Sequence, residues 1–378
     1  MAKLPERARR LLHVFSTFAV GGPQTRFVSI ANALGPKYHH DILAMDADFA
    51  AAASLGREVS FACETMPVHK TGSISLANVL NARRLLRRLA PDTLLTYNWG
   101  SIEWSIANWP GLRRHVHIED GFGPDESPAR QKRSRVLARR LLLSRADRVV
   151  MPSSVLFNLA ANVWHLPRQK MLLLPNGIDC ARFARTPDPA LLESLGIDSE
   201  GLVVGTIAGL RPEKNLARLI RVFAALPADL RATLVIVGDG PERGALVRLA
   251  EQRGISARTI MTGALNEPER VIGRFTLFAL SSDTEQMPNA VLEAMAAGLP
   301  IVSTDVGDVR QMTAAENSPY IVPSDDELAL GRALQSLLRD SELRLAIGSA
   351  NERRVRAAYP LDTMVARYDA LFCADSQR

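Results

Sequence analysis

Short apolar runs alternate with amphipathic segments along this 378-residue chain. The alternation is typical of parallel α/β sheets, in which buried strands are joined by helices. The first series of expected strands covers residues 11–15, 40–44, 93–97, 115–118 and 148–151, with a helix expected over 25–34. The second series covers residues 202–207, 232–237, 259–262, 277–279 and 300–303. We therefore predict two doubly wound units that meet at a Pro/Asn/Gly junction near residues 175–187.

The length supports the same division, because 378 residues exceed one ordinary core. We expect an N-terminal domain over 1–178, a second domain over 179–358 and a final segment over 359–378. The composition, 47% hydrophobic and 23% charged, is that of a soluble globular protein, and no apolar run approaches the ~20 residues that span a bilayer. The basic N-terminus reads as a lead-in to the first strand. The three cysteines, Cys63, Cys180 and Cys373, are scattered, which predicts a cytoplasmic protein without a structural metal.

The positive charge is concentrated in the first part of the chain. Residues 1–170 contain 24 Lys and Arg against 13 Asp and Glu, whereas the remainder contains 22 against 27. Much of the excess lies in residues 81–89 and 130–145, where apolar residues recur at helical spacing. Each run predicts a helix with a basic face, which is either a solvated surface or a surface that attracts anionic lipid or an anionic acceptor. Nucleic acid is disfavoured because no aromatic residues interleave with these arginines.

The most informative segment is residues 281–298, which contains two carboxylates, Glu285 and Glu293. Pro288 and Asn289 predict the start of a helix between them, and Gly298 predicts its end. The free N–H groups around residues 287–290 suit a phosphate. A carboxylate on each side of a diphosphate would hold the hydroxyls of a sugar and of a ribose, which together make a nucleotide-sugar. The alternative is an ordinary amphipathic helix with two solvated acids.

The spacing E-x7-E and the wording PNAVLEAMAAGLPIVSTDVGDV resemble the retaining glycosyltransferases of family 4. That resemblance implies the GT-B fold, an α/β architecture of two Rossmann-like, doubly wound parallel-sheet domains facing a central cleft. It implies that Glu285 holds the transferred sugar and Glu293 the ribose, with Met287, Pro288 and Asn289 at the donor. Residues 172–179 resemble the interdomain element of the family, and a last helix near 361–372 is expected to cross back to the first domain.

Two strand-to-helix loops carry the expected phosphate contacts. Gly21 and Gly22 let the backbone approach a ligand, and they resemble the glycine loop that covers the donor in the family; a purely structural turn is the alternative. Lys214 matches the lysine that stabilises the leaving diphosphate, where other enzymes use a metal. The usual arginine falls on Gly209, and Arg211 is the expected substitute.

Three further segments complete the candidate site. Residues 262–265 are where the family holds the nucleobase by main-chain contacts, which implies roles for Gly263 and Leu265. The loop at 238–241 lacks the third glycine of a dinucleotide fingerprint, so NAD is disfavoured. In residues 115–123, Asp120 replaces a histidine of the family and is expected to accept a bond from a sugar or acceptor hydroxyl.

Two patterns in the first domain resemble metal sites. His115, His117 and Glu119 share one strand face, and Asp46 and Asp48 copy the D-x-D of metal-dependent glycosyltransferases. The first set has no further partner nearby in the sequence, and the second lies in an expected surface loop. We therefore predict no metal site and no cofactor.

The resemblance implies transfer of a sugar from a UDP- or GDP-sugar to an acceptor hydroxyl, with retention of anomeric configuration. A lipid-linked or glycan acceptor and peripheral association with the inner face of the cell membrane are expected, without nucleic acid as a partner. Two alternatives stay open, namely a degenerate GT-B protein that only binds nucleotide-sugar and a sugar-nucleotide epimerase. The epimerase is disfavoured because none of its local wording is present.

Overall fold

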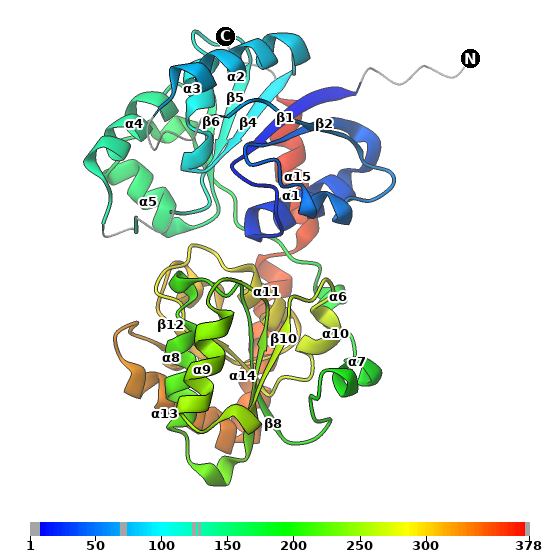
Figure 1. Ribbon diagram of the computed structural model, residues 1–378, viewed down its shortest axis with the longest axis vertical. Coiled ribbons are helices and arrows are strands. Elements are labelled where there is room, and N and C mark those ends of the chain that lie inside the picture. Colours follow the sequence, from blue (N-terminus) through cyan, green and yellow to red (C-terminus); the bar gives the residue numbers. More distant parts are fainter. Residues whose placement is uncertain (1–7, 69–73, 123–125, 128–129, 375–378) are drawn as a thin grey trace. The chain divides into compact units, whose positions relative to one another are not determined.

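The computed structural model describes residues 8–68, 74–122, 126–127 and 130–374, and the chain divides into two compact units (Figure 1). The first unit combines the chain up to Pro175 with the chain from Thr363 onward, and the second unit is Asn176–Asp362. Within the described residues, no helix is both long enough and apolar enough to cross a membrane.

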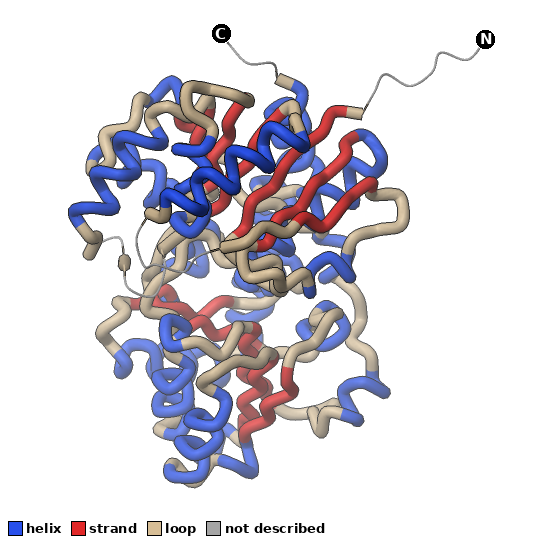
Figure 2. The backbone as a smooth tube through the Cα atoms, turned by 45° about the horizontal axis from the view of Figure 1, so that its top comes forward, coloured by secondary structure: helices blue, strands red, loops and turns tan. Residues whose placement is uncertain are grey.

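The first unit is built on a parallel sheet in the order β3-β2-β1-β4-β5-β6-β7 (Figure 2). Its strands are β1 (Arg9–Phe15), β2 (Tyr38–Ala44), β3 (Ser60–Glu64), β4 (Thr93–Tyr97), β5 (Arg114–Ile118), β6 (Arg148–Met151) and β7 (Met171–Leu173). Its helices are α1 (Gly22–Leu34), α2 (Leu76–Leu89), α3 (Glu103–Ala107), α4 (Arg133–Leu143), α5 (Ser154–Asn162) and α15 (Leu361–Cys373). The central strands are buried along their length, as expected for a parallel sheet covered on both faces.

The second unit contains a parallel sheet in the order β10-β9-β8-β11-β12-β13. Its strands are β8 (Leu202–Ile207), β9 (Ala232–Val237), β10 (Thr259–Gly263), β11 (Leu277–Leu280), β12 (Ile301–Thr304) and β13 (Ile321–Val322). Its helices are α6 (Cys180–Phe183), α7 (Pro189–Ser194), α8 (Leu216–Ala224), α9 (Arg243–Gln252), α10 (Glu269–Ile272), α11 (Asn289–Ala296), α12 (Val309–Met312), α13 (Glu327–Arg339) and α14 (Ser341–Ala358). Separate apolar clusters pack on the two faces of this sheet.

Both sheets place a switch point at the middle of the strand order, between β1 and β4 in one unit and between β8 and β11 in the other. In doubly wound sheets, ligands bind beyond the carboxyl ends of the strands at such points. The loops that follow β1, β5, β8 and β11 carry the predicted site residues. The fold therefore groups these residues at the carboxyl edge of each sheet.

Three strands are missing from the sequence-based prediction, namely β3, β7 and β13. β7 has three residues and β13 two, so neither is long enough for an apolar run to stand out. β3 lies at an edge, and its pattern is largely exposed. Each missed strand is the last strand at an edge of its sheet, where less burial is needed.

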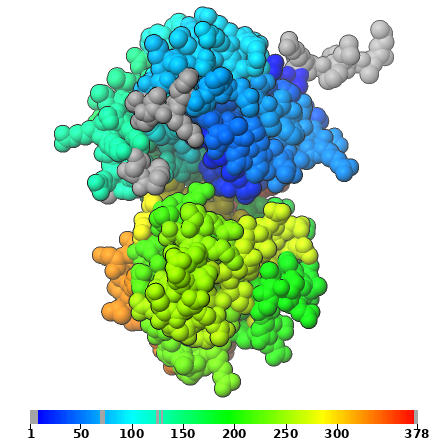
Figure 3. All heavy atoms as spheres, viewed as in Figure 1, coloured from blue at the N-terminus to red at the C-terminus, as the bar shows by residue number. Residues whose placement is uncertain are grey.

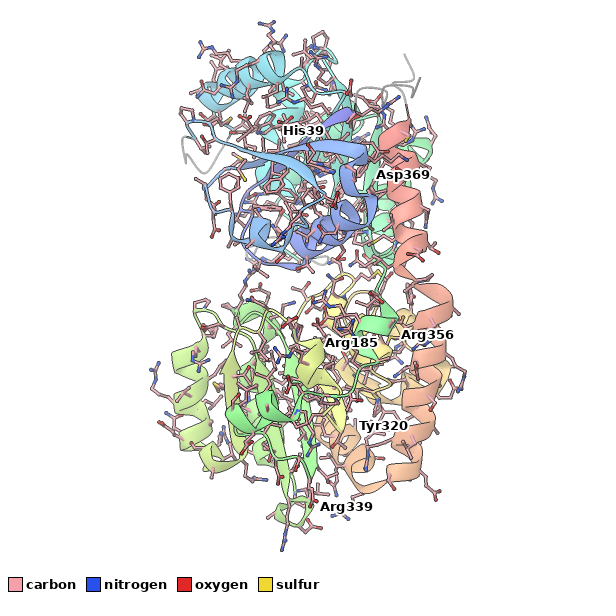
Figure 4. The ribbon with its side chains drawn as sticks, turned by 90° about the vertical axis from the view of Figure 1, so that its right-hand side faces the viewer. His39, Arg185, Tyr320, Arg339, Arg356 and Asp369 are labelled. Atoms are coloured by element: carbon pink, nitrogen blue, oxygen red, sulfur yellow. The ribbon has the colours of Figure 1, made fainter. Side chains whose placement is uncertain are left out.

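The final helix, α15, returns to the first unit and packs there through Tyr368 and Phe372, which are buried. The phenol of Tyr38 and the ammonium of Lys37 both contact the carboxylate of Asp369, at 2.7 Å each (Figure 4). Just before this helix, the main chain of Ile178 exchanges hydrogen bonds with Tyr359 and Leu361. The chain thus enters and leaves the second unit through two adjacent segments.

Candidate functional site

The loop between β11 and α11 forms the centre of the site in the second unit. Pro288 is in extended conformation and precedes the first residue of α11, Asn289, so the helix begins where the sequence predicts. The helix ends at Ala296, and Gly298 follows with φ of 71°. The start of α11 is therefore the position at which the positive end of the helix dipole favours an anion.

Two supports of this loop escaped the sequence-based prediction. The amide of Asn176 donates to the main-chain oxygen of Met287 at 3.0 Å and to the side-chain oxygen of Asn289 at 2.9 Å. A Cβ atom on Gly307 would lie 2.6 Å from the main-chain oxygen of Glu285, so the loop packs directly on that glycine. Asn176 belongs to the Pro-Asn-Gly segment, which from sequence indicates only a turn. Its bonds to the start of α11 depend on the tertiary fold.

Glu285 and Lys214 meet in this unit although they are far apart in sequence. The Nζ atom of Lys214 lies 2.6 Å from Oε1 of Glu285, and the hydroxyl of Ser282 donates to the same oxygen at 2.7 Å. The Glu285 side chain is 9% exposed and that of Lys214 is 24% exposed. The pair is therefore well ordered by its neighbours and still reachable by a ligand.

The position of Lys214 is fixed by the turn between β8 and α8. Asn215 follows it with φ of 41° and caps α8 by accepting the N–H of Arg218. The hydroxyl of Ser281, at the end of β11, lies 3.2 Å from the carbonyl oxygen of Lys214 and 3.0 Å from that of Asn215. These bonds connect the loops after β8 and β11, which explains how the lysine reaches Glu285.

Arg211 is exposed in the same turn. Its Nε atom lies 3.6 Å from the point that a Cβ atom on Gly209 would occupy. The side chain of Arg211 therefore lies close to Gly209, the position at which the family usually has an arginine. The role of Arg211 at the diphosphate stays a prediction.

The glycines at 238 and 240 hold the loop that leads to Arg211. Both have positive φ, and a Cβ atom would lie 1.9 Å from the oxygen of Ala208 in one case and 2.6 Å from that of Leu210 in the other. The N–H of Leu210 also donates to the carbonyl of Asp239 at 2.9 Å. The glycines thus allow a close backbone contact, and no dinucleotide is needed to explain them.

Glu293 lies within α11, where it is partly buried. Desolvation raises the pKa of its carboxyl to about 7, although Arg182 opposes the shift and Glu269 adds to it. Arg182 is itself held by Glu269 through two bonds of 2.7 and 3.0 Å. Because Arg182 is already paired with Glu269, it only partly offsets the rise in the pKa of Glu293.

This shift predicts a pH-dependent stability. The folded-state pKa of Glu293 exceeds its ordinary value, so stability falls as pH rises from about 4.5 to 7 and remains lower above 7. We expect Glu293→Gln to stabilise the free protein by about 1–3 kcal/mol at pH 8 and by much less at pH 5. Urea unfolding at both pH values measures this, with the exposed Glu251→Gln of α9 as control. A stabilisation that is equal at both pH values would contradict the prediction.

Gly263 and Leu265 lie at the end of β10, where the sequence places the nucleobase. Gly263 has φ of 79°, and its carbonyl accepts the N–H of Gly238 at 2.8 Å. Leu265 is partly buried and packs against the core of this unit. The main chain of 264–265 therefore follows a fixed, tightly turned strand end.

In the first unit, Gly21 and Gly22 form the start of α1 after β1. Gly21 is extended and precedes the helix, and a Cβ atom there would lie 2.9 Å from the side-chain oxygen of Gln24. The amide of Gln24 donates to the carbonyl of Thr17 at 2.8 Å, which closes the loop onto its helix. The glycine loop is thus compact and leads directly into the start of α1.

Asp120 forms a buried ion pair with Arg26 of α1, which the sequence-based prediction did not include. Both carboxylate oxygens contact the guanidinium, one of them at 2.8 Å, and the two side chains are 9% and 4% exposed. The N–H of Asp120 donates to Asn98, and the Arg26 guanidinium lies 5.8 Å from the ring of Tyr368. Both oxygens of the Asp120 carboxylate are therefore already paired with Arg26, whereas the sequence-based prediction is that this carboxylate accepts a bond from a substrate hydroxyl.

His115, His117 and Glu119, the first pattern that resembles a metal site, belong to a chain of hydrogen bonds. Thr96 bonds to both His115 and His117 at 2.8 Å, and His117 continues to Glu119 at 3.2 Å. Burial lowers the pKa of His115 to about 3, so this ring is neutral. Among the residues that the structure describes, no group of three or more His, Cys, Asp or Glu is arranged to hold a metal.

The second pattern, Asp46 and Asp48, lies in an exposed turn. Asp46 accepts the N–H of Asp48 at 3.0 Å, and Asp48 accepts that of Ala50 at 2.9 Å. These carboxylates shape the loop backbone, as Asp residues commonly do in turns.

The basic run at 130–145 is not one uniform surface. Arg139 is fully buried, where it pairs with Glu126 at 3.1 Å and lies within 5.1 Å of the rings of Trp99 and Trp164. Arg135 pairs with the same Glu126 at 3.0 Å. The predicted helix with a basic face forms as α4, but the buried Arg139 does not belong to that face, and Glu126 offsets part of the charge of the run.

Two family descriptions match the chain in succession. "Glycosyltransferase Family 4" matches residues 20–182, and "Glycosyl transferases group 1" matches residues 188–354. A 2-deoxystreptamine N-acetyl-D-glucosaminyltransferase of Streptomyces fradiae is 28% identical over 313 residues, which cover 78% of this chain and 72% of that protein.

A second relative acts, by its name, on a diphospho-undecaprenol. This N-acetylgalactosamine-N,N'-diacetylbacillosaminyl-diphospho-undecaprenol 4-alpha-N-acetylgalactosaminyltransferase of Campylobacter jejuni is 27% identical over 57% of this chain and 58% of its own length. With several relatives the chain thus aligns over only about half of their length.

The solved structures of similar fold include Anabaena HepE in complex with UDP and glucose. It has a TM-score of 0.81 and 18% identity, with 96% of this chain and 99% of that chain covered. This likeness, together with the two parallel sheets, confirms the predicted GT-B fold.

Proposed function

The chain belongs to glycosyltransferase family 4, and we propose that it transfers a sugar from a nucleotide-sugar to an acceptor hydroxyl with retention of configuration. The observation that carries this proposal is the Lys214–Glu285 pair beside the start of α11. It combines a cation, a carboxylate and the N-terminal turn of a helix in one loop cluster. A diphosphate with a sugar attached requires these same three features.

Each group has a distinct role in the proposed complex. The N–H groups at 287–290, together with Lys214 and Arg211, bind the diphosphate. Glu285 accepts hydroxyls of the transferred sugar, Glu293 accepts those of the ribose, and the main chain of 263–265 holds the base. Donor binding then exchanges the Lys214–Glu285 contact for contacts of both residues with the ligand.

The proposed step is a displacement on one face of the sugar. The bond between C1 and the diphosphate oxygen breaks while the acceptor oxygen bonds to C1 from the same side. The acceptor proton passes to the departing diphosphate, so no protein base is required. Lys214 and Arg211 stabilise the negative charge that the diphosphate gains.

The donor is proposed to be a UDP- or GDP-sugar. The UDP complex of the Anabaena protein supports UDP, and a mycobacterial relative whose name specifies GDP-mannose supports GDP. A lipid-linked acceptor is supported by the diphospho-undecaprenol in the name of the Campylobacter jejuni relative.

The deciding experiment is a calorimetric screen of UDP- and GDP-sugars followed by a transfer assay with a polyprenyl-diphosphate-linked acceptor. We expect one donor to be consumed and the product to keep the anomeric configuration of that donor. Tight binding without transfer or hydrolysis would favour a degenerate nucleotide-sugar-binding protein. Recovery of the donor with an inverted sugar centre would favour an epimerase.

Turnover is predicted not to depend on a divalent metal. Lys214, Arg211 and the start of α11 supply the positive charge that a metal would otherwise provide. Saturating EDTA should leave kcat within about twofold, whereas loss of an assisting metal costs several kcal/mol of transition-state stabilisation. A collapse of activity that magnesium restores would contradict this prediction.

The first unit is predicted to associate reversibly with anionic membranes. Exposed arginines lie beside exposed leucines on α2 (Arg84, Arg87, Leu80) and on α4 (Arg133, Arg140, Leu137). Figure 3 shows the outer surface of this unit, to which both helices contribute. Each basic residue near such a membrane contributes about 1 kcal/mol, and salt screens the attraction.

Sedimentation with phosphatidylglycerol vesicles at low and high salt measures this association. Arg84→Gln combined with Arg133→Gln should reduce pelleting at low salt, while Arg332→Gln, in the second unit, serves as control. Equal pelleting with neutral vesicles would show that the basic faces are only solvated surface.

A further inference from the structure

A cavity lies in the first unit, beside α15. Its volume is about 330 Å³, within the usual range for small-molecule sites. Arg114 and Arg148 line it from the first positions of β5 and β6, and Arg367 lines it from α15. The proposed donor and sugar contacts of this unit, in contrast, follow the carboxyl ends of strands. The cavity is therefore separate from them.

One face of α15 forms a wall of this cavity. Arg367, Ala370, Leu371 and Ala374 recur at helical spacing and all line it. Asp369 projects from the same helix toward Lys37 and Tyr38 instead (Figure 4). The helix thus binds the unit through one face and presents a second face to the cavity.

The cavity contains more positive than negative charge. Arg148 donates to the carbonyl of Asp147 at 2.8 Å, and Arg367 donates to that of Leu173 at 2.7 Å. Within the described ranges, neither guanidinium has an ion pair with a carboxylate. The one lining carboxylate, Asp147, accepts the N–H of His115 at 2.8 Å. A guanidinium has five N–H donors, so several remain for an anion.

The rest of the wall is apolar. Leu172 and Leu174, from β7 and the residue after it, face the cavity together with Leu371 of α15. A bare inorganic anion would leave these side chains without a partner. An anionic head group with a short apolar chain would contact both kinds of wall.

We propose that this cavity binds a phosphate monoester with an alkyl chain, its phosphoryl group between Arg148 and Arg367 and its chain against Leu172, Leu174 and Leu371. Arginine forks match phosphate oxygens, and burial of the chain removes apolar surface from water. The shared chemistry fits the head-group end of a lipid phosphate or a small free phosphate ester. This site is independent of the proposed glycosyl transfer.

The test is calorimetry on the full chain with octyl phosphate, inorganic phosphate and octyl glucoside as probes. Octyl phosphate should bind, inorganic phosphate should bind at least 10-fold more weakly, and octyl glucoside should not bind. Saturating UDP should leave the octyl phosphate affinity unchanged, which separates this site from the donor site. Competition by UDP, or equal binding of octyl glucoside, would overturn the proposal. If inorganic phosphate binds as tightly as the ester, the alkyl part of the proposal is wrong.

Three variants sharpen the test. Arg148→Gln and Arg367→Gln should each weaken octyl phosphate binding by 10-fold or more, and the control Arg332→Gln, whose side chain is 70% exposed in the second unit, should not. Ala370→Trp fills the cavity from an exposed helix position and keeps all three arginines, so it tests the site without loss of charge. Wild-type affinity in this filled variant would overturn the assignment even if an arginine variant fails to fold.

Discussion

Replacement of Lys214 by alanine is expected to lower kcat by roughly 10²-fold or more while changing donor affinity much less. Charge on the departing diphosphate is greatest in the transition state, so its counter-charge contributes mainly there. The ammonium lies 2.6 Å from Glu285 and 24% of the side chain is exposed, so it can turn to a bound diphosphate. Steady-state kinetics with the identified donor separate the two parameters.

A matched control for this variant exists in the other unit. Lys37 also pairs with a carboxylate, Asp369, at 2.7 Å, and its side chain is 48% exposed. Lys37→Ala should leave kcat close to wild type, because neither residue of this pair is among the proposed donor contacts. If Lys214→Ala shows a normal kcat with a raised KM, the lysine binds the ground-state phosphate only.

Loss of either partner of the Arg26–Asp120 pair is expected to destabilise the first unit by about 3–5 kcal/mol. The two side chains are 4% and 9% exposed, so each single change to alanine leaves a buried charge without its partner. The double variant Arg26→Met with Asp120→Leu removes both charges. It should cost far less than the sum of the single changes, as a urea-unfolding cycle can show.

The surface pair Arg339–Asp229 supplies the comparison. Its atoms are 3.2 Å apart, but its side chains are 52% and 68% exposed, so Arg339→Ala should change stability by about 1 kcal/mol or less. If Asp120→Ala is as stable as wild type and loses only transfer, the carboxylate serves the substrate and Arg26 is not its structural partner. We expect instead that Asp120→Ala lowers the free energy of unfolding of the first unit.

The sequence predicts the positions of elements and residues well where these depend on a single strand–loop–helix unit. Glu285, the start of α11 at Asn289 and the loop with Lys214 after β8 are local, so residue order and turn chemistry are enough to place them. The long central strands were predictable for the same reason, since each is an uninterrupted buried run. The GT-B fold followed from these local units and the family resemblance.

What the sequence could not provide are partners separated by many residues. Arg26 and Asp120 are 94 positions apart, and Asn176 and Met287 are 111 apart. Arg139 reads as part of a basic surface, yet it is buried beside Glu126. Whether a charge is solvated or neutralised depends on what the fold places against it, and spacing along the chain does not contain that information.

The return of α15 to the first unit has a consequence for biosynthesis. A ribosome delivers the whole second unit before it delivers the helix that completes the first, since residues 176–362 precede Thr363. The core around Tyr38 therefore cannot be completed until Tyr368 and Phe372 have been synthesised. By then the second unit already has every strand and helix of its own. We expect the second unit to reach its native state before the first, in contrast to the usual order in which N-terminal domains fold first. During that interval we expect the side chains that α15 covers in the native first unit, such as Tyr38, to be exposed.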